Sequence, residues 1–135
     1  MIYENEFIRM ELVDDVVYAD YKPNVFIDIE EAKNIVEQRN KLANQKPHYV
    51  LVKGGPITIA PNARSYALNR ESAKNILAWA IVDKMNLFKT AFLKILFFTQ
   101  GKGHSMRFFG TEDEAMAWLN KKRKETPPPI TNLSN

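Results

Sequence analysis

Two short apolar runs constrain the fold of this chain more than any other feature. Residues 48–52 (HYVLV) and 76–82 (ILAWAIV) are apolar almost throughout, so neither offers a polar face to water. Strands of this kind are covered on both faces, as in a parallel sheet flanked by helices. Segments with helical periodicity lie between the runs. The sequence therefore predicts an α/β fold with a mainly parallel sheet and right-handed crossovers.

The N-terminal part of the chain predicts an antiparallel hairpin. Residues 7–12 and 16–21 are rich in aliphatic and aromatic side chains, and Asp14-Asp15 separates them. A short polar break between two such runs is typical of a tight turn.

Helix starts are marked at three further places. Asp28 with Glu31, and Thr111 with Glu114, have the spacing of capping boxes, and Pro61 suits the first turn of a helix. With a last strand at residues 106–109, the expected order is β-β-α-β-α-β-α-β-α.

The most apolar stretch, residues 85–103 (MNLFKTAFLKILFFTQGKG), predicts a core helix followed by a turn. Its longest unbroken apolar run is residues 95–98, far short of the roughly 20 residues that a membrane span requires. Residues 94–99 also fit a buried strand, and periodicity does not decide between the two.

Two apolar residues of this stretch fall among the polar ones on a helical projection. Leu93 and Phe97 lie one turn apart and are framed by Lys89 and Lys94. We expect these four residues to form a surface for a protein partner or for a second copy of the chain. The alternatives are two singly exposed apolar side chains, or a helix rolled slightly toward its neighbours so that both are covered.

Composition indicates one globular domain, residues 1–125, followed by a disordered proline-rich tail, residues 126–135. The chain has no cysteine, and its N-terminus lacks an apolar signal core; we therefore expect a cytoplasmic protein. The net charge is +3, and Lys121–Lys124 account for the excess. We interpret this cluster as the basic end of a helix, so no nucleic-acid partner is expected.

Residues suited to catalysis or metal binding are scarce. His48 and His104 lie far apart in the sequence, and no serine lies in a Gly-x-Ser-x-Gly elbow. We expect no catalytic residue, no metal site and no cofactor.

Polar residues gather where the predicted strands end. Asp83 and Asn86 follow the second apolar run, while Thr58, Asn62 and Arg64 surround the start of a helix after the first. Open α/β sheets bind ligands at the carboxyl ends of their strands, so these five residues are a candidate ligand edge.

The same segments carry a family resemblance. The chain resembles the STAS fold of anti-sigma-factor antagonists and the related bacterial STAS/SEC14-like small proteins, through NVFIDIEEAKNIVE (24–37), KPHYVLVKGG (46–55), IAPNARSYAL (59–68), ILAWAIVDKMN (76–86) and FFGTEDEAMAWL (108–119). In the regulatory members the resemblance implies a phosphorylated serine in an Asp-Ser motif. The matching region, residues 52–62, has no Asp-Ser pair, so we expect no such switch.

Two functions remain open from the sequence. The first is a non-enzymatic regulatory or protein-interaction module. The alternative is a small carrier of an apolar or lipid-like ligand between sheet and helices, which the SEC14-like part of the resemblance implies. A carrier should enclose a cavity of roughly 300 Å³ or more, whereas an interaction module should have a filled core and an exposed apolar patch.

Overall fold

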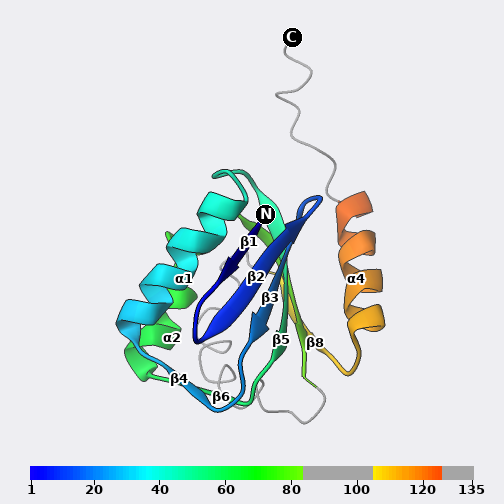
Figure 1. Cartoon of the computed structure of the whole chain (residues 1–135). Coiled ribbons are helices and arrows are strands. Elements are labelled where there is room, and N and C mark those ends of the chain that lie inside the picture. The colour runs from blue at the N-terminus through cyan, green and yellow to red at the C-terminus, as the bar shows by residue number, and fades with distance from the viewer. Residues whose placement is uncertain (84–104, 126–135) are drawn as a thin grey trace.

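A computed structural model of the chain describes residues 1–83 and 105–125. Its centre is a six-stranded mixed sheet with the order β1-β2-β3-β5-β7-β8 (Figure 1). The strands of this sheet are β1 (Ile2–Glu4), β2 (Ile8–Val13), β3 (Val16–Tyr21), β5 (His48–Gly54), β7 (Ile76–Val82) and β8 (Met106–Phe109). The described part of the chain has the mainly parallel α/β architecture expected from the sequence.

The predicted hairpin is present. β2 and β3 pair antiparallel from Ile8↔Tyr21 to Val13↔Val16, and Asp14 at their turn has a φ of 56°. Aspartate tolerates this left-handed conformation better than most residues do. β1 adds a short antiparallel edge strand that the sequence did not predict.

The other half of the sheet is parallel. β3 pairs with β5, β5 with β7 and β7 with β8, each in the parallel sense. Gly54 ends β5 with a φ of +97°, and a Cβ there would lie 2.2 Å from the Tyr21 carbonyl oxygen. Only glycine allows the backbones of β3 and β5 to approach this closely.

Three helices lie on the described part of the sheet. α1 (Ile29–Leu42) and α2 (Pro61–Ala67) pack together on one face, while α4 (Glu112–Glu125) covers the other (Figure 1). The predicted caps are confirmed, because the Asp28 carboxylate accepts the Glu31 amide at 2.8 Å and the Thr111 hydroxyl accepts the Glu114 amide at 3.1 Å. The predicted helix within residues 85–103 and the tail from residue 126 lie outside the described residues.

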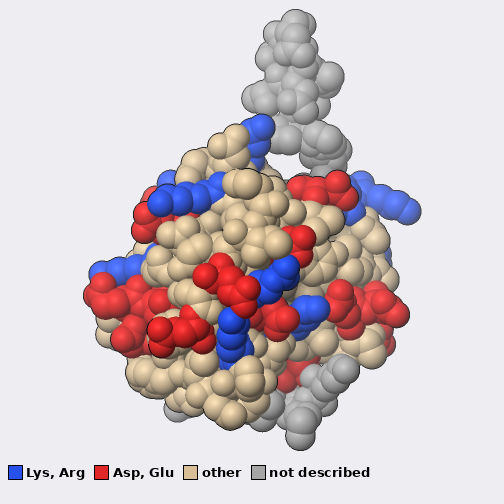
Figure 2. Space-filling model, in the orientation of Figure 1, with Lys and Arg blue, Asp and Glu red and all other residues tan. Residues whose placement is uncertain are grey.

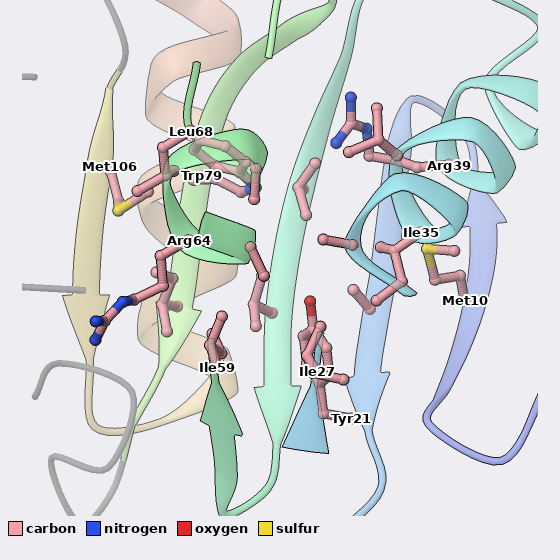
Figure 3. Close-up of a pocket in the computed structure, with 18 residues that line it drawn as sticks. Met10, Tyr21, Ile27, Ile35, Arg39, Ile59, Arg64, Leu68, Trp79 and Met106 are labelled. Atoms are coloured by element: carbon pink, nitrogen blue, oxygen red, sulfur yellow. The ribbon is translucent and has the colours of Figure 1, made fainter. Parts of the chain in front are cut away.

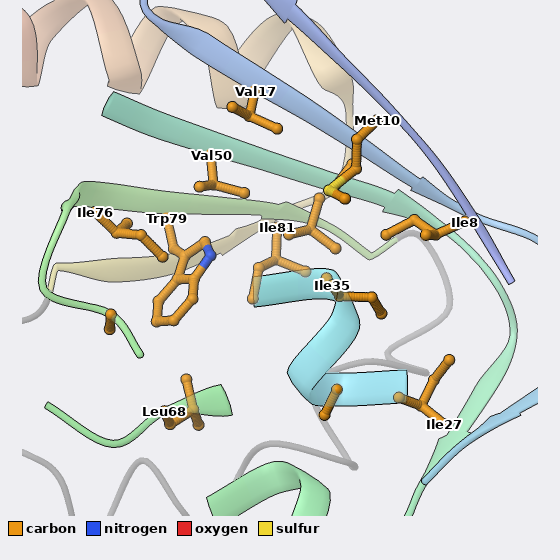
Figure 4. Close-up of a cluster of buried hydrophobic side chains, with 14 of the residues drawn as sticks. Ile8, Met10, Val17, Ile27, Ile35, Val50, Leu68, Ile76, Trp79 and Ile81 are labelled. Carbon is orange, nitrogen blue, oxygen red and sulfur yellow. The ribbon is translucent and has the colours of Figure 1, made fainter. Parts of the chain in front are cut away.

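Each face of the sheet has its own apolar core. The larger core lies under α1 and α2, where the sheet side chains of Met10, Val50 and Trp79 meet Ile35 of α1 and Leu68 after α2 (Figure 4). The smaller core lies under α4 and is built on Leu51, Ala80 and Leu119 among others. The two apolar runs, which alternate between these cores, are therefore buried on both faces as predicted.

A second, two-stranded sheet lies at the carboxyl edge of the main sheet. β4 (Val25–Ile27) and β6 (Ile57–Ile59) pair in parallel, with Phe26 opposite Thr58. We call this pair the β4–β6 ribbon. Neither the pairing nor β6 was predicted, since three-residue strands show no useful periodicity. The ribbon connects the segment before α1 to the segment before α2.

The basic cluster forms the last turn of α4, as predicted. Arg123 makes an ion pair with Asp15, with Nη2 and Oδ1 2.6 Å apart. This contact fastens the end of α4 to the β2–β3 turn. Among the helices of the described residues, none has the length and apolar character to cross a bilayer.

Candidate functional site

A small cavity lies in the larger core, between the sheet and the helices α1 and α2 (Figure 3). Its volume is about 70 Å³. Most of its wall is aliphatic or aromatic, and Tyr21, Arg39 and Arg64 bring the polar groups. The apolar wall consists of Met10, Ala19, Ile27, Ala32, Ile35, Val36, Val50, Val52, Ile59, Ala63, Ala67, Leu68, Trp79, Ile81 and Met106.

Arg39 is the most unusual residue of this wall. It lies one helical turn after Ile35, on the face of α1 that packs against the sheet, and only 5% of its surface is exposed. Its Nη2 donates to the Ser72 carbonyl oxygen at 2.6 Å, and its buried Nε has no hydrogen-bond partner in the described part of the chain. No carboxylate in residues 1–83 and 105–125 forms an ion pair with it.

Burial dominates the electrostatics of the cavity. It lowers the pKa of Arg39 from 12.5 to about 10, against the opposing effect of the nearby Tyr21 and Tyr66 hydroxyls. It also raises the pKa of Tyr21 to about 12. At neutral pH the cavity is therefore lined by a charged guanidinium and a neutral phenol, whose hydroxyl is directed into the cavity (Figure 3).

A polar cluster adjoins Arg39 at the start of β5. His48 is 1% exposed, and its Nδ1–H donates to the Lys46 carbonyl oxygen at 2.8 Å. Its Nε2 is buried and has no partner within residues 1–83 and 105–125. Burial lowers the pKa of His48, the bond to Lys46 opposes that shift, and the charge of Arg39 adds to it. The buried Ser72 hydroxyl also has no partner within these ranges. Three side chains of one region thus keep buried polar atoms unsatisfied.

The carboxyl edge of the sheet presents a different kind of surface. Phe26 on the β4–β6 ribbon is 55% exposed, and its ribbon partner Thr58 is exposed beside it. Pro23, Asn24 and Pro56 are also exposed in the turns that flank the ribbon. We call these five residues the ribbon surface; none of them carries a charge.

A surface groove lies over the half of the sheet that α4 leaves uncovered. Its wall is polar and comprises Arg9, Glu11, Val13, Tyr18, Asp20, Lys53 and Glu112. Several of its charges are paired with each other or with close neighbours, as in Arg9–Glu11 and Lys53–Glu112. This belt of alternating charge is visible across the front of the molecule (Figure 2).

The structure places four of the five residues of the predicted ligand edge. Thr58 and Asn62 are exposed at the surface, and Arg64 is half-buried and lines the cavity. Asp83 is buried at the end of β7, where its amide donates to the Phe109 carbonyl oxygen at 2.8 Å. Only Arg64 of these four contributes to the cavity wall.

The remaining predicted site residues lie outside the described residues. They are Asn86 of the ligand edge and the four residues of the partner surface, Lys89, Leu93, Lys94 and Phe97. The partner surface therefore stays a prediction. Within the described ranges, no group of three or more histidine and carboxylate side chains could hold a metal ion.

Sequence reasoning missed Arg39 as a site residue, although a signal for it exists. Arg39 follows Ile35 and Val36 at helical spacing and precedes Leu42, so it occupies an apolar face of the predicted helix. A charged residue at such a position lies either at the border of the apolar face or inside the core, where charged side chains are almost never fully buried unless they are paired.

Comparison with solved structures defines the class of fold. The chain is similar to an uncharacterised protein from Shewanella loihica PV-4, described as a DUF3478-family protein with a SpoIIAA-like fold. The TM-score is 0.55 at 19% sequence identity, and the match covers 83% of this chain and 91% of that one. At this identity the likeness concerns the fold alone, and it confirms the STAS-like fold expected from the sequence.

The chain belongs to a family described as "Domain of unknown function (DUF7793)", whose profile matches residues 10–123. No match was found among curated proteins.

Proposed function

We propose that this protein is a non-enzymatic interaction module that binds a partner protein through the ribbon surface. The exposure of Phe26 supports this proposal more than any other observation. More than half of this large aromatic side chain faces water, although the described part of the chain has a well-buried core. Aromatic side chains are enriched at the centres of protein interfaces, where their burial contributes most to affinity.

The ribbon surface also indicates the kind of partner. On the face shown in Figure 2, the described residues at the end that carries β4 and β6 lie below the belt of charged residues and include few charged side chains. Electrostatic steering by a nucleic acid or an anionic membrane needs a basic surface. An uncharged segment with an apolar side chain to pack on Phe26 fits this surface better.

The small volume of the cavity favours an interaction module over a lipid carrier. A lipid-like ligand needs roughly 300 Å³ or more, and the cavity holds about 70 Å³. The proposal that the protein is not an enzyme rests on the sequence, which offers no set of acid, base and nucleophile.

Affinity capture from the cells of origin tests the proposal with matched variants. Phe26→Asp places a charge in the ribbon surface, and Leu77→Asp does the same at another exposed apolar residue, 39% exposed on β7. We expect one protein to be captured by the wild type and by Leu77→Asp, and to be depleted at least tenfold with Phe26→Asp.

Two further measurements separate the alternatives. A double variant, Leu93→Asp with Phe97→Asp, perturbs the partner surface predicted from the sequence. If this variant loses the captured protein and Phe26→Asp retains it, the ribbon surface is not the binding site. Light scattering gives the solution mass: a wild-type dimer that Phe26→Asp makes monomeric would identify a second copy as the partner.

A further inference from the structure

We propose that the cavity beside Arg39 is a binding site for a short-chain aliphatic carboxylate. The guanidinium of Arg39 would pair with the carboxylate, and the apolar wall would enclose the short tail. The site is distinct from the ribbon surface and from the function proposed for it.

The charge of Arg39 is the first step of the argument. A buried charge is normally paired, because an isolated ion inside a protein loses its hydration without compensation. Arg39 is 95% buried, yet its described partner is a single backbone carbonyl, and that bond leaves the charge unbalanced. An anion that entered the cavity would supply the missing countercharge.

The free donor of Arg39 is the second step. Its Nε–H is buried and has no acceptor among the described residues. A guanidinium recognises planar anions by directed N–H donors, and the bonds it forms with carboxylates are among the strongest in proteins. A carboxylate oxygen would satisfy Nε–H and balance the charge together, whereas a water molecule would do only the first.

The apolar wall and the volume define the rest of the ligand. Beyond Arg39, the wall near Leu68, Trp79 and Ile35 is apolar and suits a hydrocarbon tail (Figure 3). An apolar cavity of about 150 Å³ is large enough to hold benzene, a molecule of six carbon atoms. A cavity of about 70 Å³ therefore encloses a tail of two or three carbon atoms and excludes a long acyl chain. Propionate and butyrate have this size.

Trp79 provides a direct assay because it lines the cavity. The chain has two tryptophans, so Trp118→Phe leaves Trp79 as the sole tryptophan. Its emission would be measured during titration with sodium butyrate, with 1-butanol as a neutral ligand of the same chain length and with sodium chloride at matched ionic strength. We expect a saturable change with butyrate, and a dissociation constant at least tenfold lower than that of 1-butanol.

Two variants assign the effect to the site. Arg39→Met keeps an unbranched apolar stem and removes the guanidinium with its charge, so the preference for butyrate over 1-butanol should disappear. Ala67→Leu adds bulk from the α2 side of the wall and retains Arg39; it should weaken butyrate at least tenfold. This second variant keeps the test decisive if Arg39→Met does not fold.

Several results would overturn the inference. They are the absence of a saturable response to butyrate, equal binding of butyrate and 1-butanol, and a preference for butyrate that survives in Arg39→Met. Phe26→Asp should bind butyrate like the parent protein, so failure of the partner proposal and failure of this one are distinguishable.

Discussion

Replacement of Arg39 by methionine should leave the unliganded protein as stable as the wild type, or more stable. Burial lowers the pKa of Arg39 from 12.5 to about 10, and each unit corresponds to 1.36 kcal/mol between the charged and neutral forms. Holding the charge in the folded protein therefore costs about 3 kcal/mol. Methionine removes this cost but leaves the Ser72 carbonyl oxygen without its donor, at a loss of about 1–3 kcal/mol. The net change in the free energy of unfolding should lie between about 0 and +2 kcal/mol.

Urea denaturation at pH 7, without added carboxylate, measures this change directly. Arg70→Met is the matched control because Arg70 is exposed, and its effect should stay within about 0.5 kcal/mol. If Arg39→Met lowers the free energy of unfolding by more than about 2 kcal/mol, the guanidinium is a structural element of the core. The reasoning that reserves its charge for a ligand would then be refuted.

Two further predictions concern the frame around the cavity. Gly54→Ala should lower the free energy of unfolding by roughly 3–5 kcal/mol, because a Cβ at a φ of +97° would collide with the Tyr21 carbonyl oxygen. Thermal melts measure the effect. The control is Gly110→Ala, whose Cβ meets only the Glu114 carboxylate at 3.6 Å and which should be nearly neutral. Burial holds the pKa of His48 below 6.5, so the unfolded chain takes up this proton first as the pH falls. Wild-type stability should therefore decline from about pH 6.5 down to the pKa of the folded state. In His48→Asn this part of the decline should be absent between pH 7 and pH 5; an identical decline in both proteins would contradict it.

Much of the fold could be predicted because its signals are local. The buried strands, the hairpin at Asp14 and the caps at Asp28 and Thr111 all depend on residues within a few positions of each other. The pairing of β4 with β6 depends on contacts about 32 residues apart in the register Val25↔Ile57, and no short window of sequence contains them. The strands are also too short for their alternation to be recognised.

The candidate site could be predicted only in part, for a similar reason. Residues such as Asn62 and Arg64 were selected because they follow a strand, and this rule locates an edge without determining which side chains turn inward. Arg64 contributes to the cavity wall, while Asn62 is exposed to water. The isolation of Arg39 depends on the path of residues 69–75, which brings the Ser72 carbonyl oxygen to its guanidinium. That path has no periodic pattern to read.

The β4–β6 ribbon ties together the starts of the two helices that cover the cavity. β4 ends at Ile27 and α1 begins at Ile29, while β6 ends at Ile59 and α2 begins at Pro61. A partner that displaced the ribbon would therefore displace the starts of both helices, whose residues form one wall of the cavity. If an occupant of the cavity and a partner on the ribbon favour the same position of these two helices, each must tighten the binding of the other by an equal factor.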